Sequence, residues 1–294
     1  MLITLNARCR GFEHIKTDKP VQDSAFSGTS KNFGYAFVAD GHGGEKYIRS
    51  DVGSSYACYS AANIIANLKK DFLAELKRLS NEPNKRKRLV EENLKLVCSK
   101  LCLDWQTKVK QHFISNPLTE DEMKLCENAK LLLPIEEDDV PVLYGTTLLV
   151  TFYFEQPNFW FALQIGDGKC VAIDNDNNSF YPIAEDEEQG FGITKSLCSK
   201  NASEDFRYAY GFEPIKSLFV MSDGMTDSFD IEKLPAFLLN IQNNAIEDLE
   251  KTQTELESFL PTLSEQGSGD DISIAAIFHK ENENTLLNKI LNKK

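Results

Sequence analysis

The chain has 294 residues, 41% of them hydrophobic, enough for a substantial core in one large domain or two average ones. Its formal net charge of −13 opposes binding to nucleic acid or to an anionic membrane surface, because both are negatively charged. The seven cysteines are irregularly spaced and form no CxxC pair, which argues against a structural zinc site or a disulfide framework.

The N-terminus alternates in polarity and does not resemble a signal peptide, and no apolar run approaches the roughly 20 residues of a membrane span. We therefore expect a cytoplasmic protein without nucleic-acid or membrane partners. Export to a host cell is the alternative, and the oligomeric state is left open.

The first half of the sequence combines short strands with long helices. Residues 33–39 are an apolar run that ends at Asp40 in a glycine-rich turn, which predicts a buried strand. Apolar residues spaced by three or four predict one long helix over residues 45–79. The expected elements of this half are strands at 2–7 and 33–39, a loop at 11–23, and helices at 45–79 and 85–114.

The second half begins with an acidic segment. We interpret residues 117–139, which contain TEDE and IEEDD, as an acidic surface insertion, because runs of like charge are usually solvated. Residues 175–210 are expected to form an irregular, flap-like excursion. The other expected elements are strands at 142–154, 159–165, 170–174 and 217–221, helices at 231–243 and 245–259, and a closing strand at 272–278. This order predicts an α+β fold, a sandwich of sheets with helices outside.

Four aspartates stand beside glycine where apolar strands are predicted to end or begin: Asp40, Asp167, Asp223 and Asp270. Each Asp-Gly pair alone is a common turn. Four at strand ends would converge at one edge of the packed sheets, where carboxylates repel strongly unless a cation neutralises them. Hard divalent ions such as Mg²⁺ and Mn²⁺ prefer these oxygen ligands. The pattern therefore predicts a metal site.

The sequence contains no other motif for a nucleophile. It has no GxSxG, no P-loop pattern and no cysteine in a phosphate-binding loop. A water activated by a pair of metal ions is then the economical nucleophile for attack on phosphorus.

Five segments stand out in chain order: FVADGHGG (37–44), YGTTLLV (144–150), IGDG (165–168), LFVMSDGMTD (218–227) and GDDISI (269–274). They resemble, in the same order, the motifs of the type 2C metal-dependent protein serine/threonine phosphatases, including a bacterial-type subgroup. The resemblance implies a four-layer α-β-β-α sandwich with two central, mainly antiparallel sheets. It also implies a catalytic domain over residues 1–280, followed by a polar tail at 281–294.

The resemblance implies a metal-binding role for most of the matched acids. Asp40 would bridge two Mn²⁺ or Mg²⁺ ions, and the carbonyl of Gly41 would bind one of them. Asp223 and Asp270 would complete the ligands of the second ion. Asp167 would help Asp223 to hold a weaker third ion.

Two further positions match residues beside the metals. His42 matches the proposed general acid of the family, which suits an imidazole because it titrates near neutrality. A structural turn histidine is the alternative for His42. Asp271 would lie near the waters bound to the metals.

The N-terminal motif departs from the family pattern, in which many members have a phosphate-binding arginine followed by an acidic pair. The stretch from His14 to Asp23 contains no arginine. Asp23 is expected to supply the acidic group as a metal ligand, and Gln22 stands where others have glutamate. His14 and Lys19 are candidate phosphate contacts, and a solvated loop charge is the alternative for Lys19.

These observations predict an enzyme that hydrolyses phosphoserine and phosphothreonine in a phosphoprotein partner. An inactive phosphatase-like regulator is one alternative, and a phosphatase of small phosphate esters is another, because the surroundings of a metal centre select its substrate.

Overall fold

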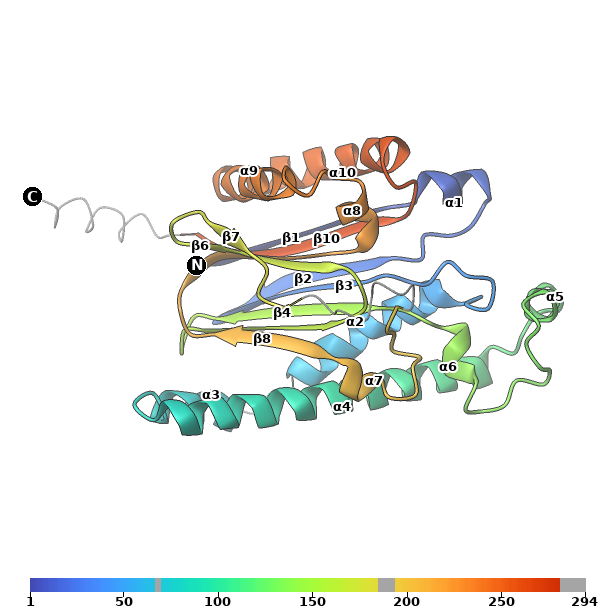
Figure 1. The fold of residues 1–294 in the computed structure, drawn as a ribbon, viewed down its shortest axis with the longest axis horizontal. Coiled ribbons are helices and arrows are strands. Elements are labelled where there is room, and N and C mark those ends of the chain that lie inside the picture. Colours follow the sequence, from blue (N-terminus) through green and yellow to red (C-terminus); the bar gives the residue numbers. More distant parts are fainter. Residues whose placement is uncertain (67–69, 185–193, 281–294) are drawn as a thin grey trace, which may run out of the picture.

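The computed structural model describes residues 1–66, 70–184 and 194–280, so the predicted tail at 281–294 lies outside them. Two five-stranded sheets lie face to face, and helices cover the outer face of each, giving four layers (Figure 1). Every strand pairing in the described part of the chain is antiparallel. The predicted α+β sandwich is therefore confirmed.

The first sheet places the last strand of the fold in its interior. Its order is β1 (Leu2–Cys9), β10 (Ile272–His279), β9 (Ile215–Met221), β6 (Lys169–Asp174) and β7 (Ser179–Phe180). The pairing of β1 with β10 is continuous, and beyond it the N-terminal nitrogen of Met1 donates to the carbonyl of Lys280 at 3.0 Å. The two ends of the described fold therefore lie side by side.

The second sheet contains the most apolar strands. Its order is β2 (Ser24–Ser30), β3 (Phe33–Ala39), β4 (Leu148–Phe154), β5 (Phe159–Ile165) and β8 (Arg207–Gly211). Every residue of β4 and β5 is buried. These strands read as continuous apolar runs because the other sheet covers one face and helices cover the other.

Four long helices form the outer layers (Figure 1). The first sheet is covered by α9 (Leu234–Glu247) and α10 (Leu249–Gln266), and the second by α2 (Ser50–Ala66) and α4 (Pro83–Ser115). The shorter helices are α1 (Phe12–Lys16), α3 (Lys70–Arg78), α5 (Glu120–Asn128), α6 (Val140–Leu143), α7 (Ala202–Asp205) and α8 (Asp223–Asp227). None of the helices described combines the length and apolar composition needed to cross a bilayer.

The core consists of three apolar clusters, one between the sheets and one under each helical layer. Trp105 of α4 is completely buried in the cluster under the second sheet. Its indole nitrogen donates to the carbonyl of Gly53 at 2.9 Å, which satisfies the polar atom and joins α4 to α2.

The structure corrects several predicted elements before β4. The expected loop at 11–23 contains α1, and β2, which was not predicted, follows it. The expected helix at 45–79 begins only at Ser50, because the preceding turn is fixed by backbone bonds such as Arg49 N to the carbonyl of Leu143 at 2.8 Å. The described parts of this stretch are α2 and α3, and residues 67–69 lie outside the described part of the chain.

Several boundaries also differ in the second half. The helices expected at 231–243 and 245–259 are α9 and α10, which span 234–247 and 249–266. The expected strand at 142–154 begins only at Leu148, because Pro141 favours the first turn of α6. The expected irregular excursion at 175–210 includes β7, α7 and most of β8. Its strand β8 pairs with β5 and forms an edge of the second sheet.

The insertion at 117–139 is held to the body by one buried arginine. The Arg49 guanidinium binds both carboxylate oxygens of Glu122, at 2.7 and 3.0 Å, and donates to the carbonyl of Asn116 at 2.8 Å. Glu122 also closes a capping box with Thr119 at the start of α5. The insertion is therefore acidic at its surface, as predicted, but at least one of its acids is an internal anchor.

We expect Glu122→Gln to lower the free energy of unfolding at pH 7 by about 1–2 kcal/mol, because a largely buried arginine loses its charged partner. The hydrogen bonds from Arg49 lower the pKa of Glu122 from 4.5 to about 2. The stabilisation is therefore complete above pH 4.5 and is lost as the pH falls towards 2. Urea unfolding at pH 7 and pH 3.5 measures this difference, which should shrink at the lower pH. Asp121→Asn, which removes an exposed ion pair on the same helix, is the control and should change little.

Candidate active site

Strand pairing brings the predicted acids to one end of the sandwich. Asp23 precedes β2 and Asp40 follows β3, and the first residue of β2 lies opposite the last residue of β3. Asp223 follows β9, and Asp270 precedes β10, the strand paired with β9. Asp167 lies in the turn between β5 and β6. These acids come from both sheets and are far apart in the sequence.

Three of these carboxyl groups perturb one another strongly. Burial, together with the charges of Asp23 and Asp223, raises the pKa of Asp40 well above its usual range. Burial is also the main cause of the raised pKa of Asp23 and of Asp223. The interaction between the Asp40 and Asp223 carboxyl groups further raises the pKa of Asp40 and partly offsets the rise in the pKa of Asp223.

Asp40 is held in place by the segment before β4. Its backbone nitrogen donates to the hydroxyl of Thr147 at 3.0 Å, and its carbonyl accepts from the hydroxyl of Thr146 at 2.8 Å. Gly41 forms an isolated antiparallel bridge with Thr146, but the two hydrogen bonds of this bridge belong to the neighbours of Gly41. Its carbonyl is therefore not used by the bridge. Both threonines therefore hold the main chain of Asp40 in place.

The carboxylate oxygens are the type of ligand that a hard divalent cation prefers, but they are not arranged around a common point. The oxygen Oδ1 of Asp223 is buried without a hydrogen-bond partner, as expected of an atom that lacks a cation. The raised pKa values of Asp40 and Asp23 likewise reflect uncompensated buried charge. No group of three or more His, Cys, Asp or Glu side chains within the described residues is placed to hold a metal ion. The side chains would thus have to move closer together to bind one.

His42 lies in the turn that follows Asp40. Its backbone nitrogen donates to the carbonyl of Gly145 at 3.1 Å, and its ring packs 4.7 Å from the ring of Tyr47. Burial lowers the pKa of His42, and the nearby charge of Asp167 partly offsets this effect. The imidazole is therefore mainly neutral at pH 7. A phosphate dianion beside it would favour the charged form that an acid needs.

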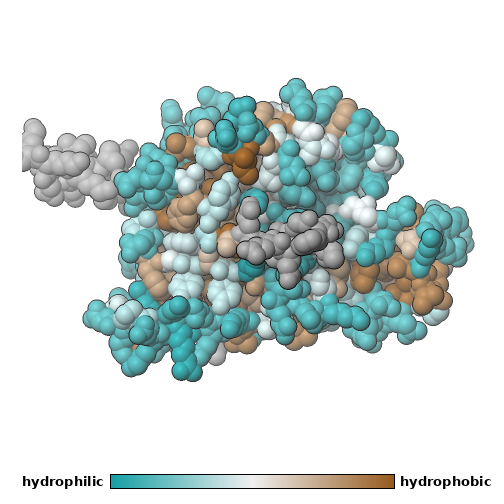
Figure 2. All heavy atoms as spheres, in the orientation of Figure 1, coloured by the Kyte–Doolittle hydropathy of each residue, from teal (hydrophilic) through white to brown (hydrophobic). Residues whose placement is uncertain are grey.

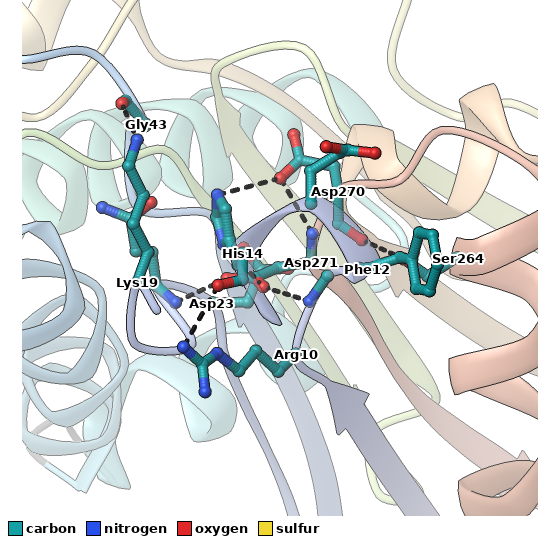
Figure 3. Close-up of polar contacts among 12 residues, drawn as sticks. Arg10, Phe12, His14, Lys19, Asp23, Gly43, Ser264, Asp270 and Asp271 are labelled. Carbon is teal, nitrogen blue, oxygen red and sulfur yellow. Dashed lines mark hydrogen bonds and ion pairs between the residues drawn. The ribbon is translucent and has the colours of Figure 1, made fainter. Parts of the chain in front are cut away.

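Both carboxylate oxygens of Asp271 accept hydrogen bonds from the N-terminal loop, so neither is free to bind a metal. Its Oδ1 accepts from the backbone nitrogen of Gly11 at 2.6 Å, and its Oδ2 accepts from that of Gln22 at 2.5 Å. The ring of His14 lies between Asp271, 2.9 Å from Nδ1, and Asp270, 3.8 Å from Nε2 (Figure 3). Burial alone would raise the pKa of Asp271, but these hydrogen bonds hold it below its usual range.

These contacts change the interpretation of His14. It is only 9% exposed, and its hydrogen bond to the Asp271 carboxylate raises its pKa. Because both ring nitrogens face carboxylates, His14 is placed to hold the loop rather than to contact phosphate. Lys19 is exposed, and its ammonium donates to the carbonyl of Gly43 at 3.1 Å (Figure 3). An ammonium has two further donors, so the predicted phosphate contact by Lys19 stays open.

The sequence reasoning overlooked two residues beside the acids. Asp227 lies four residues after Asp223 on α8, and burial and the charges of Asp167 and Asp270 raise its pKa. Its spacing from Asp223 on one helix was the available signal. The hydroxyl of Thr194 donates to Asp167 at 2.7 Å. No sequence pattern marks Thr194, because it lies in the flap-like region.

The sequence matches a known protein family over most of its length. The model of the family described as Protein phosphatase 2C matches residues 10–261. The chain therefore belongs to the protein phosphatase 2C family. No curated protein sequence matches it significantly.

Solved structures of bacterial phosphatases share the fold at low sequence identity. A bacterial serine phosphatase is 16% identical with a TM-score of 0.55, and the match covers 96% of this chain and 99% of that one. The serine/threonine phosphatase of S. agalactiae is 14% identical with a TM-score of 0.54, covering 95% and 99%. The catalytic domain of PstP, a serine threonine protein phosphatase crystallised with two manganese ions, is 14% identical with a TM-score of 0.53, covering 94% and 97%.

Proposed function

We propose that this chain is a metal-dependent phosphatase that hydrolyses phosphoserine and phosphothreonine in proteins. The observation that carries the proposal is the buried group of Asp23, Asp40 and Asp223, because a cation would relieve the burial and mutual repulsion that raise their pKa values. Membership of the protein phosphatase 2C family, and the two manganese ions crystallised with PstP, support the same reading.

The proposed roles follow from the position of each group. Asp40, Asp223, Asp23 and the carbonyl of Gly41 would hold two Mn²⁺ or Mg²⁺ ions, with Asp270 completing the set. Asp167, with Asp227 beside it, would contribute to a third, weaker site. When bound, such ions neutralise phosphate charge and supply the nucleophilic water.

Two residues of the chain would handle the substrate itself. His42, in its charged form, would protonate the departing serine or threonine oxygen, and its packing against Tyr47 fixes the ring for this step. Lys19, next to Gly43, would bind a phosphate oxygen in place of the missing arginine. Arg10 is the nearest arginine in the sequence, but its guanidinium donates to the carbonyl of His14 at 3.1 Å and pairs with Asp18 at 3.2 Å.

A phosphatase-like binding module without activity is the second candidate. It is favoured by the finding that the described acids do not already form a three-ligand metal group. A phosphatase of small phosphate esters would use the same acids and differ only in the surroundings that select the substrate.

The deciding measurement is phosphate release from a phosphothreonine peptide with added Mn²⁺, followed by excess EDTA. We expect release that requires Mn²⁺ and that EDTA abolishes. p-Nitrophenyl phosphate, tested in parallel, identifies a preference for small esters. Folded protein that releases no phosphate from either substrate with any divalent ion would contradict the proposal and favour the binding module.

A further inference from the structure

A pocket of about 260 Å³ lies directly beside the turn that carries His42. Its walls come from three parts of the chain that are distant in sequence. They are the loop before β2 (Lys19, Gln22), the stretch from the turn after Asp40 into the first turn of α2 (Glu45, Asp51) and the insertion helix α5 (Leu125). The insertion, which the proposed chemistry does not use, therefore builds one side of a pocket next to the site.

The lining combines an apolar wall with negative charge. Tyr47 and Leu125 supply apolar surface, and the side chain of Leu125 remains 49% exposed. Glu45 and Asp51 supply two carboxylates, against the single positive charge of Lys19. The ammonium of Lys19 is bonded to Gly43, on the side of the catalytic turn. The pocket therefore carries a net negative charge.

One polar atom of the lining lacks a partner. Gln22 is 8% exposed, and its amide nitrogen donates to Ser50 at 2.5 Å and to the carbonyl of His42 at 3.3 Å. Its oxygen, Oε1, is buried without a hydrogen-bond partner in the structure. An unpaired buried acceptor favours a ligand that brings an N–H donor.

The wall formed by α5 is fixed rather than loosely attached. Arg49 is only 6% exposed. Its guanidinium forms an ion pair with Glu122 on α5 and also donates to the hydroxyl of Tyr144 at 2.9 Å. In Figure 2, the region of α5 projects from the main body, with hydrophobic and hydrophilic residues mixed on its surface. A rigid wall of this kind gives the pocket a defined shape.

We propose that this pocket binds a lysine or arginine side chain of the phosphoprotein substrate, close in sequence to its phosphorylated residue. Such a side chain has an apolar stem for Tyr47 and Leu125 and an N–H-bearing cation for Glu45, Asp51 and Gln22. This inference rests on the proposed function, because it assigns the substrate class of the same site. It also gives the insertion at 117–139 a role in substrate selection.

The test compares two phosphothreonine peptides that differ only in a flanking lysine replaced by norleucine, which keeps the stem and removes the charge. With Mn²⁺ and the full chain, we expect kcat/KM to be about tenfold higher for the lysine peptide. The double variant Glu45→Gln/Asp51→Asn should remove this preference and leave hydrolysis of p-nitrophenyl phosphate unchanged. The control variant Glu120→Gln/Asp121→Asn changes the net charge equally, on exposed acids of α5 outside the pocket, and should keep the preference.

A second measurement separates the pocket from the catalysis. Fluorescence anisotropy with the same two labelled peptides, without metal, reports binding alone. If the lysine peptide binds more tightly in a way that depends on Glu45 and Asp51, but no phosphate is released, the proposed function fails and the pocket stands. If both peptides are hydrolysed and bound equally well, at every flanking position tested, the pocket proposal is overturned and the phosphatase stands.

Discussion

Asp40→Asn should lower kcat for Mn²⁺-dependent phosphopeptide hydrolysis by about a thousandfold or more, because in the proposed role it would lose a shared metal ligand and several kcal/mol of transition-state stabilisation. The same variant should raise the unfolding temperature of the protein in EDTA. The pKa of Asp40 is raised in the folded state, so its ionisation destabilises the fold above the usual pKa of the carboxyl group. Asparagine removes that cost.

Two measurements check this prediction independently. Phosphate release measures the loss of activity. Thermal unfolding in EDTA measures the gain in stability of Asp40→Asn over the wild-type protein, and this difference should disappear as the pH falls below 4. Asp176→Asn, an exposed acid in the turn after β6, is the control for net charge and should change neither quantity. A variant with wild-type turnover would show that Asp40 is not a metal ligand in catalysis.

Gly53→Ala should lower the free energy of unfolding by about 2–3 kcal/mol, although alanine is normally the better helix former by about 1 kcal/mol. Gly53 lies inside α2, where a methyl group would overlap the carbonyl oxygen of Tyr144. The carbonyl of Gly53 also accepts the indole hydrogen bond of Trp105, so α2 cannot move away without breaking that bond.

Urea unfolding of Gly53→Ala measures this effect, with Ser55→Ala on the same helix as the control. Ser55→Ala should be close to neutral, since its side chain is half-buried and makes none of these contacts. Because Tyr144 leads into the segment that supports Asp40, we also expect weaker phosphatase activity in Gly53→Ala. If the urea midpoint and the slope of the unfolding curve were unchanged, α2 and the segment before β4 would be able to move apart at little cost in free energy.

The sandwich could be predicted because its strands carry a strong local signal. Residues 33–39, 159–165 and 272–278 are apolar runs bounded by turns, and each is a strand in the structure. The short elements α1 and α6 and the strand β8 were missed, because tertiary contacts decide them. The edge strand β8, for example, has only intermediate burial and gains its conformation from pairing with β5.

The site was predictable as a set of positions but not as an arrangement. Glycine neighbours at strand ends marked Asp40, Asp223 and Asp270, and burial and the neighbouring acids raise the pKa values of Asp40 and Asp223. The sequence could not show that Asp271 and His14 bind each other, because 257 residues separate them. Nor could it show that Arg49 binds Glu122 of the insertion, since 73 residues separate the two. The metal-binding and catalytic roles stay predictions until activity is measured.

The position of β10 determines when the protein can first acquire its site during synthesis. This strand is the last of the described fold, yet it lies between β1 and β9, and the aspartates before it complete the acidic edge. While the ribosome still holds the last strand, β1 lacks its partner in the first sheet, and Asp23 lacks the hydroxyl of Ser273. The nascent chain therefore carries its acids without the framework that gathers them. If these acids bind a cation as we propose, binding would have to wait until β10 has left the ribosome and paired with β1 and β9.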